Sequence, residues 1–182
     1  FVGGLNAYLP RTIAVRAIKE VEPGFDPRRM AEARRYRYVL VGGAVRSPLL
    51  SLRAWQVRPD LDQGLMHEVG ESLVGERDFA AFAPPEASRR STRREVFAFD
   101  IRRRGRTIEL EIEANAFLMH QVRRTVATLV RVGSGKMTVK DFRRWLIEAA
   151  PGSFEAAAPP FGLYLLQVRY QPSIFTQERE QE

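Results

Sequence analysis

The stretch from residue 94 to residue 116 constrains the fold more than any other part of the sequence. It reads "REVFAFDIRRRGRTIELEIEANA" and alternates apolar and polar residues on both sides of Arg104-Gly105. A period of two on either side of a glycine predicts a β-hairpin. One face of this hairpin is expected to carry two facing sets of apolar residues, namely Phe97, Phe99 and Ile101 on the first strand and Ile108, Leu110 and Ile112 on the second.

An amphipathic helix is expected directly after the hairpin, over residues 115–132. At about 100° per residue, one apolar stripe forms from Leu118, Val122, Val126 and Leu129. His120 and Arg124 lie roughly opposite this stripe, whereas Arg123 falls at its edge. Two explanations fit Arg123. Its stem lies along the core with the charge in water, or it has an anionic partner, because an unpaired buried charge is costly.

The remaining elements predict an α+β fold. Strands are expected over residues 12–21, 33–43, 52–59 and 161–170, and helices over 60–75 and 138–150. Either Asp60 or Asp62 can cap the first of these helices, and Thr138 with Asp141 has the spacing of a capping box. The expected architecture is a largely antiparallel mixed sheet with helices packed on one face. It forms one domain over 1–172, followed by a polar tail over 173–182.

Composition excludes several classes of protein. The chain has 182 residues, of which 45% are hydrophobic and 28% are charged, as in a globular protein. Cysteine is absent and only His67 and His120 are present, so neither a disulfide nor a metal site is expected. A cytoplasmic setting is compatible with the absence of cysteine. No apolar run approaches the ~20 residues of a membrane span. No cofactor and no membrane partner are expected.

The positive charge favours a nucleic-acid partner. The net charge is +7, with 29 Lys and Arg against 22 Asp and Glu. Arginine, the more frequent cation here, matches phosphate oxygens with a planar fork of donors. An exposed loop is expected at "APPEASRRSTRRE", where Arg89 and Arg90 are candidate RNA contacts. The alternative is that the arginine content only reflects the composition of the source.

The run "ARRYRYVL" at residues 33–40 is the second candidate for a site. On a strand, Tyr36 and Tyr38 share one face while Arg35 and Arg37 point to the other. An aromatic ring among arginines can stack on a nucleobase while the cations hold phosphate. The alternative is ordinary packing of both rings in the sheet. Likewise, Leu163 begins the last strand and lines either a flat pocket or the core.

These runs, in this order, resemble the TruA-type tRNA pseudouridine synthases. The resemblance covers residues 5–171 and rests on "LNAYLPRTIAVR", "ARRYRYVL", "LVGERDFAAF", "IEANAFLMHQVRR" and "GLYLLQVRY". It implies isomerisation of uridine to pseudouridine at nucleotides 38, 39 and 40 of the tRNA anticodon arm, without a metal or organic cofactor. It also implies a cytoplasmic homodimer that binds tRNA.

The resemblance assigns a role to several residues. Tyr36 matches the tyrosine that stacks on the flipped base and helps to remove the C5 proton. Arg123 matches the arginine that pairs with the catalytic aspartate, and Leu163 matches the apolar residue under the base. Phosphate contacts are then expected from the remaining cations, namely Arg35, Arg37, Arg89, Arg90, His120 and Arg124.

One element of the family pattern is missing. The catalytic aspartate belongs to an Arg-Thr-Asp segment followed by Gly-Val-His, and no such segment occurs in the 182 residues. Asp60 in "RPDLDQG" has the Arg-x-Asp spacing but is interpreted as a helix cap. We therefore expect the chain to be the C-terminal part of such an enzyme and to be inactive alone. The alternatives are a non-catalytic RNA-binding module and a structural domain.

Overall fold

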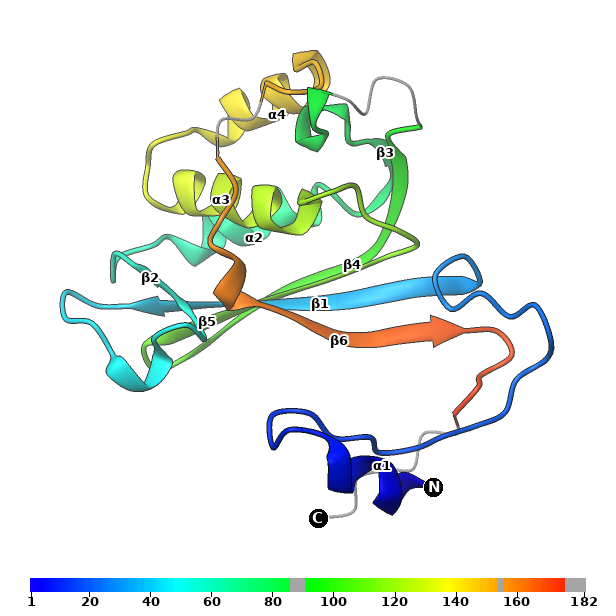
Figure 1. Ribbon diagram of the computed structural model, residues 1–182. Coiled ribbons are helices and arrows are strands. Elements are labelled where there is room, and N and C mark those ends of the chain that lie inside the picture. The colour runs from blue at the N-terminus through cyan, green and yellow to red at the C-terminus, as the bar shows by residue number, and fades with distance from the viewer. Residues whose placement is uncertain (86–90, 154–155, 176–182) are drawn as a thin grey trace. The chain divides into compact units, whose positions relative to one another are not determined.

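The computed structural model describes residues 1–85, 91–153 and 156–175 (Figure 1). The chain divides into two compact units. The first contains residues 1–31 together with the chain from residue 169 onward, and the second contains residues 32–168. The expected domain over residues 1–172 and the expected tail over 173–182 have other bounds than these two units, and that division stays a prediction.

A mixed sheet of six strands forms the framework of the second unit. Its strands are β1 (Ala31–Gly42), β2 (Trp55–Val57), β3 (Gly75–Asp78), β4 (Arg93–Arg104), β5 (Thr107–Ala114) and β6 (Leu163–Tyr170). The order is β2-β1-β5-β4-β3, and β6 also pairs with β1. The β1–β2 pair is parallel, whereas the β1–β5, β4–β5 and β3–β4 pairs are antiparallel. The predicted fold class is confirmed.

Helices cover one face of this sheet. They are α2 (Gln63–Glu71) and α3 (Gln121–Gly133), with α4 (Val139–Glu148) packed against α2 farther from the sheet, while α1 (Val2–Tyr8) belongs to the first unit (Figure 1). The core lies between sheet and helices and includes Leu40, Val69, Phe99, Ile108, Leu129 and Phe142. Helix α2 lies so close to β4 that a Cβ atom on Gly70 would overlap the ring of Phe99.

The hairpin is present, but one of its apolar residues faces outward. The strands β4 and β5 pair in register around a turn at Gly105, as predicted. A β-bulge between Val96 and Ala98 shifts the alternation on β4. Val96 therefore faces the core together with Phe99, and Phe97 is exposed. The expectation for Phe97 was wrong because a bulge places one extra residue on one strand and reverses the faces beyond it.

The predicted strand over residues 12–21 does not form. These residues adopt no regular structure, and their apolar side chains, such as Ile13 and Ile18, are exposed. Instead, the side-chain amide of Asn6 donates to the carbonyl of Val15 at 2.9 Å and accepts from its N–H at 2.7 Å. A strand needs a partner strand for its backbone groups, and here one side chain supplies both bonds.

Helix α3 begins later than the predicted 115–132 range. The Oδ1 atom of Asn115 accepts from the backbone N–H groups of Glu95 and Ala116, which holds this residue against β4. His120 then adopts a left-handed conformation with φ 61° before the first helical residue, Gln121. The polar side chains of this segment bond to the backbone outside a helix, which the apolar period does not reveal.

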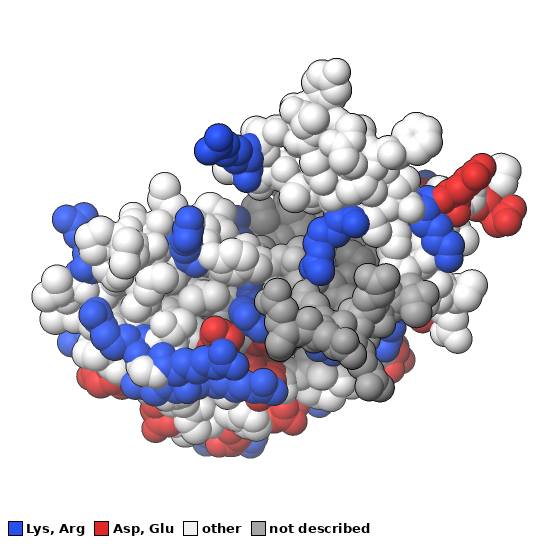
Figure 2. Space-filling model, turned by 90° about the horizontal axis from the view of Figure 1, so that it is seen from below, with Lys and Arg blue, Asp and Glu red and all other residues white. Residues whose placement is uncertain are grey.

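The face of the sheet opposite these helices carries charges of both signs. Arg35 pairs with Glu113 at 2.6 Å, and Arg37 pairs with Glu111 at 2.6 Å and with Glu109 at 3.4 Å. Figure 2, which views the molecule from below, shows basic and acidic side chains next to one another. Across the part of the chain that the structure describes, no helix has both the length and the apolar character that a membrane crossing needs.

The cap of α2 gives a first prediction. The carboxylate of Asp62 accepts from the N–H of Leu65 at 3.0 Å, so Asp62→Ala is expected to lower the free energy of unfolding by about 1 kcal/mol. Urea denaturation of the 182-residue chain measures this loss. The interpretation of Asp60 as a helix cap was wrong, because Asp60 is exposed and lies outside the helix, so Asp60→Ala is the matched control. Equal losses in the two variants would contradict the assignment of the cap.

Candidate active site

Tyr36 and Tyr38 lie on the face of β1 that the helices cover, as expected from their spacing. Tyr38 is fully buried, whereas Tyr36 is half-buried and packs against the edge of the core. The ring of Tyr36 meets that of Phe117 edge to face, with 5.3 Å between the ring centroids. Phe117 comes from the turn between β5 and α3, so this turn positions one edge of Tyr36 and leaves the ring partly open.

Arg123 is held by a backbone carbonyl. Its Nε donates to the carbonyl oxygen of Ala158 at 2.6 Å, and the N–H of Ala158 donates to the carbonyl of Arg123 at 3.1 Å. Within residues 1–85, 91–153 and 156–175, no carboxylate pairs with this guanidinium. The pairing of Arg123 with an anionic partner stays a prediction. The side chain is fixed at the core edge, and its terminal nitrogens remain available for an anion.

Tyr38 joins Arg123 to the segment that precedes β6. Its hydroxyl donates to the carbonyl of Pro159 at 2.7 Å. Burial raises the pKa of Tyr38 well above its ordinary value, although the nearby charge of Arg123 opposes this shift. The phenol thus stays protonated and keeps donating. Its ring also contacts Gly162, where a Cβ atom would lie 2.7 Å from two ring carbons.

Leu163 follows Gly162 directly and opens β6, which pairs with β1. Its side chain is half-buried and packs against the core. Tyr38 therefore brings Arg123 and the start of β6 to the same stretch of β1, two residues from Tyr36. The resemblance assigns roles in catalysis and in the base pocket to three residues on or beside this stretch, namely Tyr36, Arg123 and Leu163.

The candidate RNA contacts are distributed differently. Arg35 and Arg37 lie on the opposite face of the sheet from Tyr36, where they bond to Glu113 and Glu111. Cross-strand pairs of this kind stabilise a sheet, so both arginines have a structural role. Their contact with RNA stays a prediction.

The two remaining described candidates lie at the start of α3, next to Arg123 in the sequence. His120 is exposed at the N-cap of α3, and Arg124 donates from Nη1 to the carbonyl of Phe82 at 2.6 Å. The predicted contacts at Arg89 and Arg90 fall outside the described residues.

Sequence reasoning missed two contributors to this site. Phe117 lies in the run "IEANAFLMHQVRR", where the sequence predicts no role for it, although its ring supports Tyr36. Tyr38 was interpreted only as a neighbour of Tyr36, yet it anchors the segment that holds Arg123. Its burial was available from the alternation along β1, but its bond to Pro159 joins residues 121 positions apart and leaves no local signal.

The site contains no carboxylate among the described residues that is bonded to Arg123. The described residues also hold no cluster of three or more His, Asp or Glu side chains arranged to bind a metal ion. Two concave regions of about 510 and 460 Å³ lie beside Trp55, and neither is lined by Tyr36, Arg123 or Leu163. Among the described residues, the arrangement therefore combines a partly open aromatic ring with a fixed guanidinium that is bonded to no carboxylate.

The contact between Gly162 and Tyr38 gives a second prediction. Gly162→Ala is expected to lower the free energy of unfolding by about 1 to 3 kcal/mol, because the new methyl group displaces the Tyr38 ring. Thermal and urea unfolding measure the loss. Gly4→Ala serves as the control, since a Cβ atom there meets nothing within 4 Å. An unchanged stability of Gly162→Ala would show that the ring has room to move.

Comparison with known proteins identifies the family. The tRNA pseudouridine synthase family matches residues 70–171. The tRNA pseudouridine synthase A of Geobacter sulfurreducens is 42% identical over 172 residues, which cover 93% of this chain and 70% of that protein. The proteins of the same name from Aliivibrio fischeri and Haemophilus influenzae are 40% and 39% identical over 168 residues, which cover 92% of this chain.

This chain spans 64% of the length of the Aliivibrio fischeri relative and 62% of the Haemophilus influenzae relative. About a third of each relative therefore has no counterpart here. The matched part includes the strand with Tyr36, the helix with Arg123 and the start of β6. The identity extends over nearly the whole chain rather than over one motif, and the chain belongs to the tRNA pseudouridine synthase family.

Proposed function

We propose that this chain is the RNA-binding and base-binding part of an enzyme that converts uridine to pseudouridine in tRNA. The proposed targets are nucleotides 38, 39 and 40 in the anticodon stem-loop. The relatives carry the name tRNA pseudouridine synthase A, which supports the tRNA substrate. The choice of nucleotides rests on the resemblance of the motifs described above.

The geometry of Arg123 is the observation that carries this proposal. A guanidinium at the core edge, fixed through Nε by a carbonyl and bonded to no described carboxylate, is placed to pair with an anion through its terminal nitrogens. The proposed partner is a catalytic aspartate outside the part of the relatives that this chain matches. Arg123 would keep that carboxylate ionised, because a nearby positive charge lowers the pKa of a carboxyl group.

The proposed reaction is an isomerisation. The bond between the sugar and N1 of the base breaks, the base turns, and its C5 atom bonds to the sugar. The C5 proton leaves and a proton is added at N1, so that no oxidant or reductant is consumed. Tyr36 is suited to stack on the flipped base and to help in the removal of the C5 proton, while Leu163 lies under the base.

The assembly and the location of the enzyme are part of the same proposal. The family resemblance supports a homodimer in the cytoplasm that binds the anticodon arm of tRNA. The alternative is a non-catalytic RNA-binding module, which has the same charge and the same stacking tyrosine. Turnover by the complete enzyme separates the two.

A third prediction tests the role of Arg123. In the complete protein that carries the aspartate segment, Arg123→Gln is expected to lower the rate of pseudouridine formation roughly 100-fold or more, because it removes the partner of the nucleophile. Release of tritium from tRNA labelled at C5 of uridine measures the rate. Binding of tRNA is expected to weaken only modestly.

The control for this experiment is Arg143→Gln. Arg143 pairs with Glu68 at 2.8 Å on the exposed side of the helices, so its loss changes the total charge equally without touching the site. A normal rate for Arg123→Gln, or an equal loss for Arg143→Gln, would refute the assignment.

A fourth prediction concerns the 182-residue chain alone. It is expected to bind an unmodified tRNA transcript but to form no pseudouridine, because no described residue supplies the nucleophile. The same tritium assay, with the complete enzyme as the positive control, measures this. Turnover by the chain alone would show that the nucleophile lies within the 182 residues.

A further inference from the structure

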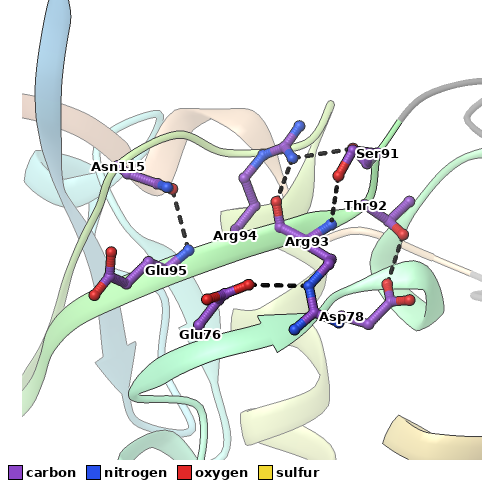
Figure 3. Close-up of polar contacts among 8 residues, drawn as sticks. All are labelled: Glu76, Asp78, Ser91, Thr92, Arg93, Arg94, Glu95 and Asn115. Atoms are coloured by element: carbon purple, nitrogen blue, oxygen red, sulfur yellow. Dashed lines mark hydrogen bonds and ion pairs between the residues drawn. The ribbon is translucent and has the colours of Figure 1, made fainter.

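Arg94 differs from the paired arginines of the sheet. Its Nη1 donates to the carbonyls of Ser91 at 3.0 Å and Arg93 at 2.6 Å (Figure 3). Its Nε is buried and has no hydrogen-bond partner in the described part of the chain. Burial lowers the pKa of Arg94, and no described carboxylate offsets this. This partly desolvated guanidinium therefore has no compensating negative charge among the described residues.

A second arginine lies directly across from it. In the register of β3 and β4, Arg77 is the partner of Arg94, so both side chains start from the same face of the sheet. Like charges in this position repel each other. On the opposite face, Arg93 has an acidic partner, because it pairs with Glu76 at 2.9 Å (Figure 3). Two cations are thus placed together on one face only.

This pair lies on the same face of the sheet as Tyr36. The register aligns Val96 with Ala114, and Tyr36 with Ile112, and all four face the helices. Arg94 is two residues from Val96 and so continues this face. With a rise of about 3.4 Å per residue and about 4.8 Å between strands, Arg94 starts ~14 Å along and ~10 Å across the sheet from Tyr36.

We propose that Arg94 and Arg77 bind one backbone phosphate of the RNA substrate. This inference rests on the function proposed above. The two carbonyls that hold Nη1 of Arg94 fix the guanidinium, and Nη2 is left to donate to a phosphate oxygen. The phosphate supplies a negative charge to two arginines that pair with no carboxylate in the described part of the chain. Because phosphates carry no base identity, this contact positions the RNA without selecting the uridine.

The test compares Arg94→Gln and Arg77→Gln with Arg93→Gln as the matched control. Arg93 is the next residue on the same strand, points to the other face and is already paired. Fluorescence anisotropy measures binding of an unmodified tRNA transcript to the 182-residue chain from 50 to 300 mM KCl. Each of the first two variants is expected to reduce the slope of log affinity against log salt by about 0.7 to 0.9. Arg93→Gln is expected to keep the wild-type slope.

The outcomes separate this inference from the proposed function. If the wild-type chain shows no tRNA binding at any salt concentration, the proposed function fails and the inference fails with it. If the wild type binds and both variants retain its slope, the inference is overturned and the proposed function stands. Should Arg94→Gln lose its native circular dichroism spectrum, Arg77→Gln decides, because Arg77 is exposed and its replacement leaves the backbone contacts intact.

A second experiment distinguishes binding of an RNA phosphate from binding of free phosphate. Inorganic phosphate is added at constant ionic strength while the melting temperature of each protein is measured. If phosphate stabilises the wild type but neither variant, and the tRNA slopes of the variants are unchanged, the site binds free phosphate and the proposal is overturned. The proposal is supported if the variants show reduced salt slopes for tRNA binding and millimolar phosphate has little effect on the melting temperature.

Discussion

The hydrogen bond from the buried hydroxyl of Tyr38 to the carbonyl of Pro159 determines where the rest of the site lies. It ties the middle of β1 to the segment before β6, and the next residue back, Ala158, exchanges two hydrogen bonds with Arg123. The helix, the central strand and the last strand are therefore joined through a few neighbouring backbone groups. Because Tyr38 is fully buried and its phenol stays protonated, this connection does not depend on solvent or on ordinary changes of pH.

Much of the framework was predictable because local chemistry agrees with the global fold. The alternation in "ARRYRYVL" gave the two faces of β1, and Asp62 and Thr138 occupy the N-caps that their side chains suggested. The errors arose where a side chain or an extra residue replaced regular backbone pairing. The bulge beside Val96 reversed the face of Phe97, and Asn6 took the place of a partner strand for Val15.

The site itself was predictable only in part. The periodicity of α3 placed Arg123 at the core edge, and the structure places it there. Its acceptor, the carbonyl of Ala158, comes from a segment 35 residues away and belongs to the backbone, so no residue type signals it. Arg94 was one of four arginines in a loop-like run, and only the register with β3 shows that its neighbour across the strands is another cation. Tertiary pairing, rather than composition, separates these two arginines from those that merely balance glutamates.

The opposed arginines on β3 and β4 also connect folding to the solution around the chain. Dissolved ions screen the repulsion between two charges at the end of a sheet, and the screening length is about 10 Å at 0.1 M salt. Among the described residues, the short strand β3 pairs only with β4, so no second strand there offsets that repulsion. Local opening of this corner, visible as exchange of the backbone amide hydrogens of β3, should therefore become rarer as the ionic strength rises. Ion pairs respond in the opposite direction, and those that join β1 to β5 through Arg35 and Arg37 weaken under the same change.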